Sequence, residues 1–277
     1  MATDEPLLQA MIVTRGEMTT PEVRPLAGGQ VAVFSARSPG KETDNEDAAA
    51  VIPAGRGAVI LAVADGVGGH RAGAEAAELA MQALLDSVTG STPGTGLLRT
   101  AILDGLERAN DAIRALGIGA ATTMAAVELD GSTIRPYHVG DSTILVVGQR
   151  GRIKLLTVAH SPVGYAVEAG LLDHREAIHH QDRHIVSNIV GSPEMRIEVG
   201  RTLKLQQRDT VLLGSDGLFD NLHLAEIVDL IRKGPLASAA GTLAEQCRRR
   251  MQDPQPEHPS HPDDLTFLIY RCCPDGR

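Results

Sequence analysis

The chain has 277 residues, a formal net charge of −9 and a hydrophobic fraction of 43%, which is enough apolar material for one large folded domain. Aromatic residues make up only 2% of the sequence and no stripe of basic residues is present, which argues against a nucleic-acid-binding protein. The longest apolar run, residues 58–64, is far shorter than the ~20 residues that span a membrane, and the N-terminus has no signal-peptide pattern. The three cysteines match neither a disulfide framework nor a metal motif, so we expect a cytoplasmic protein.

The N-terminal segment, residues 1–30, mixes proline, glycine and charged residues, and we expect it to form a loose arm or an extra edge strand. The main domain is predicted to span 31–272, with a short tail at 273–277. Three strands are predicted at its start, and the last of them is apolar on both faces, as in a central strand. They span 31–36, 47–52 and 58–65.

Two amphipathic helices are predicted after these strands. Apolar residues recur at steps of three and four over 77–88 and again over 98–116. Each pattern gives one apolar stripe and a polar back, so each helix should lie on a sheet. The sequence STPGTG, at 91–96, predicts the turn between the two helices.

The second half of the chain predicts a run of strands, an irregular stretch and a second helix pair. The strands are predicted at 122–129, 133–139, 143–148, 152–157, near 195–205, at 210–214 and at 265–271. The stretch 158–193 looks irregular with a short helix near 163–171, and paired helices are predicted near 223–233 and 236–251. Because the helices come in pairs and not one per strand, the order indicates antiparallel sheets with helix pairs packed outside.

Acidic residues recur at the ends of predicted strands. They occur in four short motifs, Asn45-Glu46-Asp47, Asp65-Gly66, Asp216-Gly217 and Asp263-Asp264. A single Asp-Gly pair is most often a turn, but four acidic motifs beside apolar strands are harder to explain as turns. Oxygen ligands from several strand ends suit Mg²⁺ or Mn²⁺, and no cysteine and histidine set with zinc spacing accompanies them.

These acidic residues lie within an ordered series of motifs that resembles the metal-dependent Ser/Thr protein phosphatases of type 2C, the PPM family. The six motifs are Asn45-Glu46-Asp47, VADGVGG (63–69), GAATT (119–123), HVGDS (138–142), LLGSDGLFD (212–220) and HPDDLTF (261–267). Their order matches over roughly 31–272, and the GVGG form resembles the bacterial branch. The resemblance implies an α+β fold, a four-layer α-β-β-α sandwich of two antiparallel sheets flanked by helix pairs.

The resemblance also implies a site with two divalent ions, Mn²⁺ or Mg²⁺. Asp65 would bridge both ions, and Asp216 and Asp263 would complete the shell of the first. Glu46 and the carbonyl of Gly66 would hold the second ion. Asp47 would bond a water on a metal, so that the implied catalytic carboxylates are Asp65, Asp216, Asp263 and Asp47.

The activity implied by the resemblance is hydrolysis of Ser/Thr phosphate monoesters through a water activated by the two metal ions. The implied substrate is a phosphorylated protein, and the implied role is in signalling, opposing a Ser/Thr kinase. We expect no nucleic-acid or membrane partner.

The sequence departs from the family pattern at two places. The family usually carries a phosphate-binding arginine shortly before the Asn-Glu-Asp motif, whereas this chain has Glu42 there. Arg37 or Lys41 could bind the substrate phosphate instead. The third-ion ligands of bacterial members fall near Leu116 and Ala159, neither of which is a carboxylate, so a third site is predicted to be weak or absent.

Several further residues are candidates for supporting roles. His160, at the start of a predicted flap beside the site, is the best candidate for a general acid. His180 and His184 could take a zinc ion from one helical turn, although a solvated flap is the simpler interpretation. His70 could contact substrate or make a local hydrogen bond. Asp141 is expected to bond backbone at a tight turn.

Two alternative functions remain open at this level. Glu42 and the missing third-site ligands would also fit a catalytically weak or inactive pseudophosphatase that binds a phosphoprotein or another partner as a regulator. A metal-dependent phosphodiesterase is a second alternative, but no motif favours it.

Overall fold

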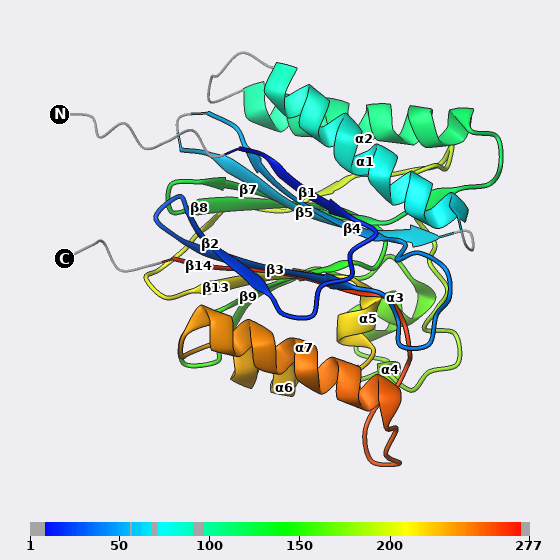
Figure 1. Cartoon of the computed structure of the whole chain (residues 1–277), viewed down its shortest axis with the longest axis vertical. Helices are drawn as coiled ribbons and strands as arrows, with labels where there is room; N and C mark the ends of the chain where they lie inside the picture. The colour runs from blue at the N-terminus through cyan, green and yellow to red at the C-terminus, as the bar shows by residue number, and fades with distance from the viewer. Residues whose placement is uncertain (1–8, 56, 68–70, 91–96, 273–277) are drawn as a thin grey trace.

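The computed structural model describes residues 9–55, 57–67, 71–90 and 97–272, and arranges them in four layers (Figure 1). Two β-sheets lie face to face in the middle, and a pair of long helices covers the outer face of each. This arrangement confirms the predicted α+β sandwich.

The first sheet is antiparallel throughout. Its strands are β1 (Met11–Thr14), β4 (Asp47–Pro53), β5 (Val59–Val67), β6 (Ala121–Thr122), β7 (Met124–Asp130), β8 (Thr133–Val139), β11 (Glu198–Val199) and β12 (Leu203–Lys204). The order across the sheet is β1-β4-β5-β7-β8-β11, with β6 paired to β5 and β12 paired to β8. The strands that carry Asp47 and Asp65 are therefore neighbours.

The second sheet is also antiparallel. Its strands are β2 (Glu22–Leu26), β3 (Gly29–Ala36), β9 (Thr143–Val147), β10 (Ile153–Leu156), β13 (Thr210–Gly214) and β14 (Leu265–Cys272). The order is β10-β9-β13-β14-β3-β2. β13 and β14 form the central pair of this sheet, and Gly214 at the end of β13 pairs with Phe267 near the start of β14. This pairing brings the segment before Asp216 next to the segment after Asp263.

Within the described residues, four helices form two pairs and three further helices are short. They are α1 (Arg71–Gly90), α2 (Leu97–Ala115), α3 (Pro162–Glu168), α4 (His174–Ala177), α5 (Asp216–Phe219), α6 (Leu224–Ile231) and α7 (Leu236–Gln252). Figure 1 shows α1 and α2 over the first sheet and α6 and α7 over the second. Among the described residues, no helix is both long and apolar enough to cross a membrane.

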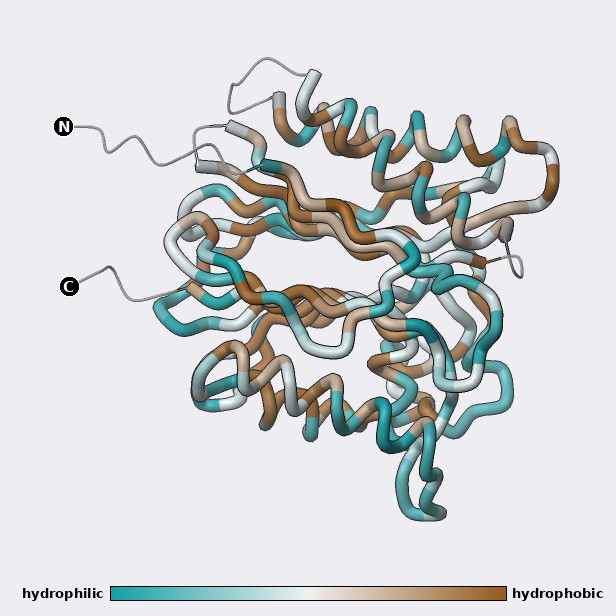
Figure 2. The backbone as a smooth tube through the Cα atoms, viewed as in Figure 1, coloured by the Kyte–Doolittle hydropathy of each residue, from teal (hydrophilic) through white to brown (hydrophobic). Residues whose placement is uncertain are grey.

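Three apolar clusters fill the three spaces between the layers, because both faces of each sheet are buried. Along β4, Ala48 and Ala50 face the helices α1 and α2, whereas Ala49 and Val51 face the second sheet. This alternation follows from the two-residue period of a strand. Hydrophobic segments accordingly concentrate between the layers (Figure 2).

The described part of the N-terminal segment, residues 9–30, contributes one edge strand to each sheet. β1 pairs with β4, and β2 pairs with β3. Pro25 lies within β2, which is tolerated because an edge strand has one side free of ladder hydrogen bonds. The domain boundaries drawn from the sequence, at residues 30 and 272, stay predictions.

Some local elements differ from the sequence prediction. The strand predicted near 195–205 consists of two short pieces, β11 and β12, separated around Gly200, where an added Cβ would lie 2.5 Å from Pro136 Cγ. Two short helices were not predicted. α4 begins with a capping box between Asp173 and Glu176, and α5 begins at Asp216 directly after β13.

Candidate active site

The predicted acidic residues meet at one end of the sandwich. Asp47 at the start of β4 and Asp65 near the end of β5 are direct cross-strand partners. Asp216 begins α5 after β13, and Asp263 precedes β14, the neighbour of β13. The charges of Asp216, Asp47 and Asp263 all act on Asp65, so the four carboxylates lie within electrostatic reach of one another. The structure therefore brings together residues that are as many as 216 positions apart in sequence.

The backbone of Asp65 is fixed by the two threonines of the GAATT motif. The Asp65 carbonyl accepts hydrogen bonds from Thr123 N–H and from the Thr122 hydroxyl, both at 2.8 Å. The Asp65 N–H donates to Thr123 Oγ1 at 3.1 Å. Thr123 Oγ1 lies 2.6 Å from Ser142 Oγ, which comes from the HVGDS motif. Two of the sequence motifs thus serve to hold Asp65 at a defined position.

Asp47 and Asp264 are held by buried hydrogen bonds. The Ser215 hydroxyl donates to Asp47 Oδ2 at 2.8 Å, and Asp47 is only 2% exposed. The carboxylate of Asp264 accepts from the N–H groups of Ser38 at 2.8 Å and Glu46 at 2.7 Å. Asp264 therefore fixes the loop that presents Glu46, while its neighbour Asp263 stays at the open side of the cluster.

Glu46 and the Gly66 carbonyl converge on one spot. A Cβ atom added to Gly73, in the first turn of α1, would lie 2.6 Å from Glu46 Oε1 and 2.9 Å from the Gly66 carbonyl oxygen. Only glycine at position 73 leaves room for these two oxygens to approach each other. The pairing of Glu46 with the Gly66 carbonyl, which the family resemblance implied, is thus present in the geometry.

The donor set of this site fits divalent metal ions. Three buried side-chain N or O atoms of the described residues have no hydrogen-bond partner, and two of them are Glu46 Oε1 and Asp216 Oδ1. A buried carboxylate oxygen without a partner is costly, and bound metal is one means of satisfying it. All the candidate ligands are hard oxygen donors, which Mg²⁺ and Mn²⁺ prefer.

The electrostatics of the cluster also favour bound cations. Burial, followed by the charge of Asp264, raises the pKa of Asp47 to about 8. Burial and the neighbouring carboxylates raise the pKa values of Asp65 and Asp216 well above the usual range. Like charges in a desolvated site cannot all ionise unless protons or cations offset them.

Two more carboxylates, Asp141 and Asp220, lie beside Asp216 and line the same cavity. Burial raises the pKa of each to about 6. The sequence-based prediction for a third ion concerned positions 116 and 159 and did not include these two carboxylates. Asp141 follows strand β8, so its place at a strand end was the available signal. The weak or absent third ion site stays a prediction. The lack of carboxylates at Leu116 and Ala159 does not suffice to support it, because Asp141 and Asp220 offer other carboxylates near Asp216.

Comparison with known proteins places this fold and site in a family. The family model for protein phosphatase 2C matches residues 39–251, which is most of the chain. The chain belongs to the protein phosphatase 2C family. The predicted family and the predicted enzyme class, a protein phosphatase, are thereby confirmed.

Relatives and solved structures of this phosphatase come from bacteria, in agreement with the predicted branch. The protein phosphatase PhpP of Streptococcus pneumoniae is 34% identical over 214 residues, covering 73% of this chain and 85% of PhpP. The serine/threonine phosphatase structure of S. agalactiae is 27% identical with a TM-score of 0.75, covering 87% of this chain and 98% of that one. The structure of Mycobacterium tuberculosis PstP/Ppp is 25% identical with a TM-score of 0.71, covering 88% and 98%.

The two cations predicted to bind phosphate have different surroundings. Lys41 Nζ lies 2.6 Å from Asp264 Oδ2 and 2.8 Å from Glu46 Oε2, inside the site. Although burial lowers its pKa, the bonds to Asp264 and Glu46 outweigh burial and raise it. Arg37 pairs instead with Glu17 at 3.0 Å, and its guanidinium also donates to the carbonyl of Thr43 at 3.3 Å. Lys41 is therefore the cation that the fold brings to the acidic cluster.

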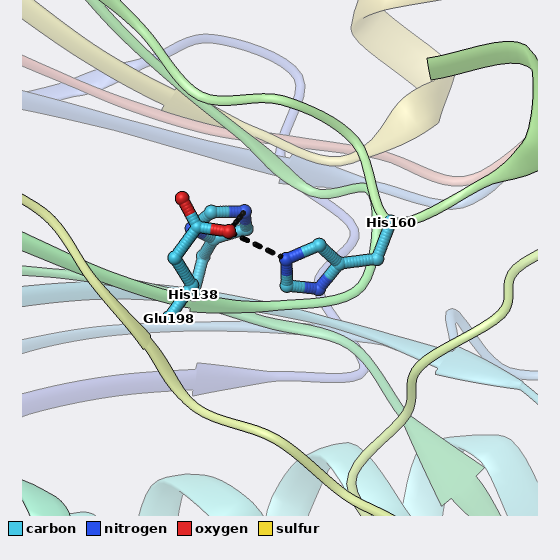
Figure 3. Close-up of side chains that lie close together, drawn as sticks. All are labelled: His138, His160 and Glu198. Carbon is cyan, nitrogen blue, oxygen red and sulfur yellow. Dashed lines mark hydrogen bonds and ion pairs between the residues drawn. The ribbon is translucent and has the colours of Figure 1, made fainter. Parts of the chain in front are cut away.

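His160 is a buried residue whose ring is hydrogen-bonded within the protein. Its side chain stacks on His138 with ring centroids 4.3 Å apart, and Glu198 bridges them from β11 (Figure 3). His160 Nδ1 accepts from Gly140 N–H at 3.1 Å and faces Asn188 Nδ2 at 2.9 Å, while Nε2 lies 3.1 Å from Glu198 Oε2. Both ring nitrogens are thus engaged within the protein, and the acid role of His160 stays a prediction.

The same hydrogen bonds argue against a metal ion between His138, His160 and Glu198, whose potential ligand atoms lie within 4.8 Å of one another. Since Nδ1 of His160 accepts an N–H bond, a neutral ring carries its proton on Nε2 and donates it to Glu198. His138 Nε2 faces the Val158 carbonyl at 3.0 Å and must also carry a proton. Neither nitrogen has a free lone pair for a metal.

Two other histidine predictions have different outcomes. The candidate zinc pair His180 and His184 is not part of any group of three possible ligands found among the described residues. His70, which could contact substrate, lies outside the residues that the structure describes.

We expect the metal-free protein to lose stability as pH rises through the range where Asp47 ionises. The folded state holds the Asp47 proton up to pH about 8, whereas the unfolded chain releases it near pH ~4, so this stabilising contribution is present at low pH and lost towards pH 8. In EDTA, Asp47→Asn should show a smaller fall in melting temperature between about pH 5 and about pH 8 than the wild type. Exposed Asp111→Asn is the control, and parallel profiles for wild type and Asp47→Asn would contradict the expectation.

Replacing Lys41 by methionine should destabilise the protein by roughly 1.5–3 kcal/mol, because Asp264 and Glu46 would each lose a charged hydrogen bond. Arg37→Met is the matched control, since its ion pair with half-exposed Glu17 should be worth less than ~1 kcal/mol. Urea unfolding in EDTA measures both. Equal losses in the two variants would show that Lys41 has no special place in the cluster.

His160→Asn should be tolerated better than His160→Gln, because the asparagine Oδ1 can replace Nδ1 as the acceptor for Gly140 N–H. The glutamine variant should lose about 1–3 kcal/mol from the unpaired buried donor. Both variants should slow p-nitrophenyl phosphate and phosphoserine hydrolysis equally. A loss of about 10²-fold or more confined to phosphoserine, whose leaving group needs a proton, would support the general-acid role.

Proposed function

We propose that this phosphatase hydrolyses phosphoserine and phosphothreonine monoesters of protein substrates, with two Mn²⁺ or Mg²⁺ ions in the acidic site. The observation that carries the proposal is the pair of buried, unpartnered oxygens, Glu46 Oε1 and Asp216 Oδ1, beside Asp65. The names of the bacterial relatives, which include serine/threonine phosphatases, support the choice of phosphorylated residue.

The ligand assignment that we propose is the one that the family resemblance implies. Asp65 would contact both ions, Asp216 and Asp263 would hold the first, and Glu46 with the Gly66 carbonyl would hold the second. Divalent ions in such a site lower the pKa of water and neutralise charge on the phosphoryl oxygens. Two ions are proposed because a PstP catalytic domain, 24% identical to this chain, was solved in complex with two manganese ions.

The remaining residues of the site would orient the reactants. Asp47 is held by Ser215 and lies across from Asp65, so its carboxylate can accept a hydrogen bond from the attacking water and turn it towards phosphorus. The ammonium of Lys41 sits between Glu46 and Asp264, where it can attract the negatively charged ester. Arg37 is the second candidate for phosphate binding and would have to leave Glu17 to take part.

The biological setting of the reaction is also a proposal. A phosphatase of this specificity would oppose a Ser/Thr kinase in signalling, and the cysteine usage of the chain favours the cytoplasm. Among the described residues, the buried Cys247 is a free thiol, which agrees with a reducing compartment. Neither nucleic acid nor a membrane is needed as a partner.

The main alternative is a pseudophosphatase that binds phosphoproteins without turnover. It rests on Glu42, an exposed residue at the position where the family usually has arginine. The complete set of predicted metal ligands favours catalysis, because a protein that only binds a partner has no use for carboxylates that repel one another.

The deciding assay is hydrolysis of p-nitrophenyl phosphate and of a phosphoserine peptide with Mn²⁺, with Mg²⁺ and with EDTA. We expect metal-dependent turnover that falls more than about 100-fold in Asp65→Ala and in Asp216→Ala. Loss of a residue that only orients a metal ligand typically costs about 10- to 100-fold in activity, and loss of a ligand itself should cost more. Asp111→Ala, an exposed carboxylate on α2, is the matched control.

Two outcomes would contradict this proposal. Full activity in EDTA would exclude the metal-dependent reaction. Calorimetric Mn²⁺ binding without turnover of either ester would favour the pseudophosphatase, and Glu42→Arg would then test whether the acidic residue blocks the substrate. Cleavage of phosphate diesters but not monoesters would favour the phosphodiesterase.

A further inference from the structure

A cavity of about 310 Å³ opens beside the acidic site, under the segment 158–193 that we call the flap. Asp141, Asp216 and Asp220 are among the residues that line this cavity. The rest is largely apolar and is built from the end of β10, from α3 and α4, and from α5 to the start of α6. The aliphatic and aromatic lining includes Leu156, Val158, Val163, Val167, Ile178 and Phe219.

This cavity has the features of a ligand pocket and is not a packing defect of the core. Val163 and Ile178 are each 7% exposed and form firm walls, whereas Val158, Val167 and Phe219 are partly open to solvent. Its volume falls at the lower end of the ~300–1,000 Å³ typical of ligand pockets. α3 is fixed by Ser161, whose hydroxyl accepts the Gly164 N–H at 2.9 Å.

The flap exposes further apolar side chains. Of the five large hydrophobic residues exposed among the described residues, three lie on it: Tyr165, Leu171 and Ile185. Leu171 is 78% exposed. These side chains add exposed apolar surface to the same segment that contributes α3 and α4 to the cavity.

The charged residues that line the cavity restrict the kind of side chain that could enter it. Asp141, Asp216, Asp220 and Glu168 make the lining acidic, and its arginine is occupied. Arg183 Nε donates to Asp220 Oδ2 at 3.1 Å, and its Nη2 lies 2.7 Å from His261 Nδ1. An acidic side chain would therefore be repelled, while an apolar one would bury its surface against Val158, Val167 and Phe219.

We infer that the flap cavity binds an aliphatic or aromatic side chain of the phosphoprotein substrate, close in sequence to the phosphorylated residue. Asp216 belongs both to the acidic site and to the lining of the cavity. A substrate peptide with its phosphate at the acidic site therefore lies next to the cavity. The inference rests on the proposed function, because it requires the reacting phosphate to lie at the acidic cluster. The cavity would select substrates by an apolar neighbour of the phosphoserine.

The test uses phosphoserine peptides that are identical except for one residue, with leucine, serine, arginine or aspartate placed at each of three positions on either side. Leucine at one position should raise kcat/KM on the order of tenfold over serine, the usual gain from a hydrophobic pocket. Val167→Phe, which fills the cavity, should remove this ratio. Ala169→Ser, at the exposed C-cap of the same helix and outside the lining, should keep it.

A second filling variant, Ala177→Leu on α4, covers the case in which Val167→Phe does not fold, and thermal melts identify that case. The inference is overturned if leucine gives no advantage at any position, if arginine is preferred, or if both filling variants keep the leucine preference. Hydrolysis of p-nitrophenyl phosphate by the wild type distinguishes a failure of the pocket inference from a failure of the proposed function. With that turnover present, a missing leucine preference removes only the pocket, whereas no turnover of any ester overturns the proposed function and the pocket together.

Discussion

Repulsion between buried carboxylates is the constraint on which the rest of this structure depends. Asp47, Asp65 and Asp216 are desolvated together, and each raises the free energy of ionising the others. A chain keeps such a cluster only if the surrounding fold is rigid enough to hold it and if cations offset its charge. The four-layer sandwich meets the first condition, and divalent ions held by these oxygen donors would meet the second.

The rigidity comes from the way in which the ligands are attached to the two sheets. Asp47 and Asp65 lie on paired strands of the first sheet, while Asp216 and Asp263 flank paired strands of the second. Ser215 joins the two sets by its hydrogen bond to Asp47. Because both faces of each sheet are buried against apolar layers, these strand ends have little freedom to move apart and relieve the repulsion.

The surroundings of the acidic cluster divide into parts that position it and parts that face substrate. Lys41 and Asp264 tie the Glu46 loop to the start of β14, and His160 ties the Gly140 turn to the flap. The flap cavity, by contrast, has apolar walls that the reaction chemistry does not use. A phosphatase with a small polar site can gain substrate specificity from such a neighbouring pocket without altering its metal ligands.

The layer order, most strands and helices, the acidic cluster and the family could be predicted from the sequence, because hydrophobic periodicity and ordered motifs are local properties. The sequence did not reveal that Asp141 and Asp220 share the cavity of Asp216, that Lys41 and not Arg37 reaches the cluster, or that both ring nitrogens of His160 are engaged. These three points emerged only from the folded chain. Each depends on contacts between segments far apart in sequence, and no local pattern records which partner a side chain meets.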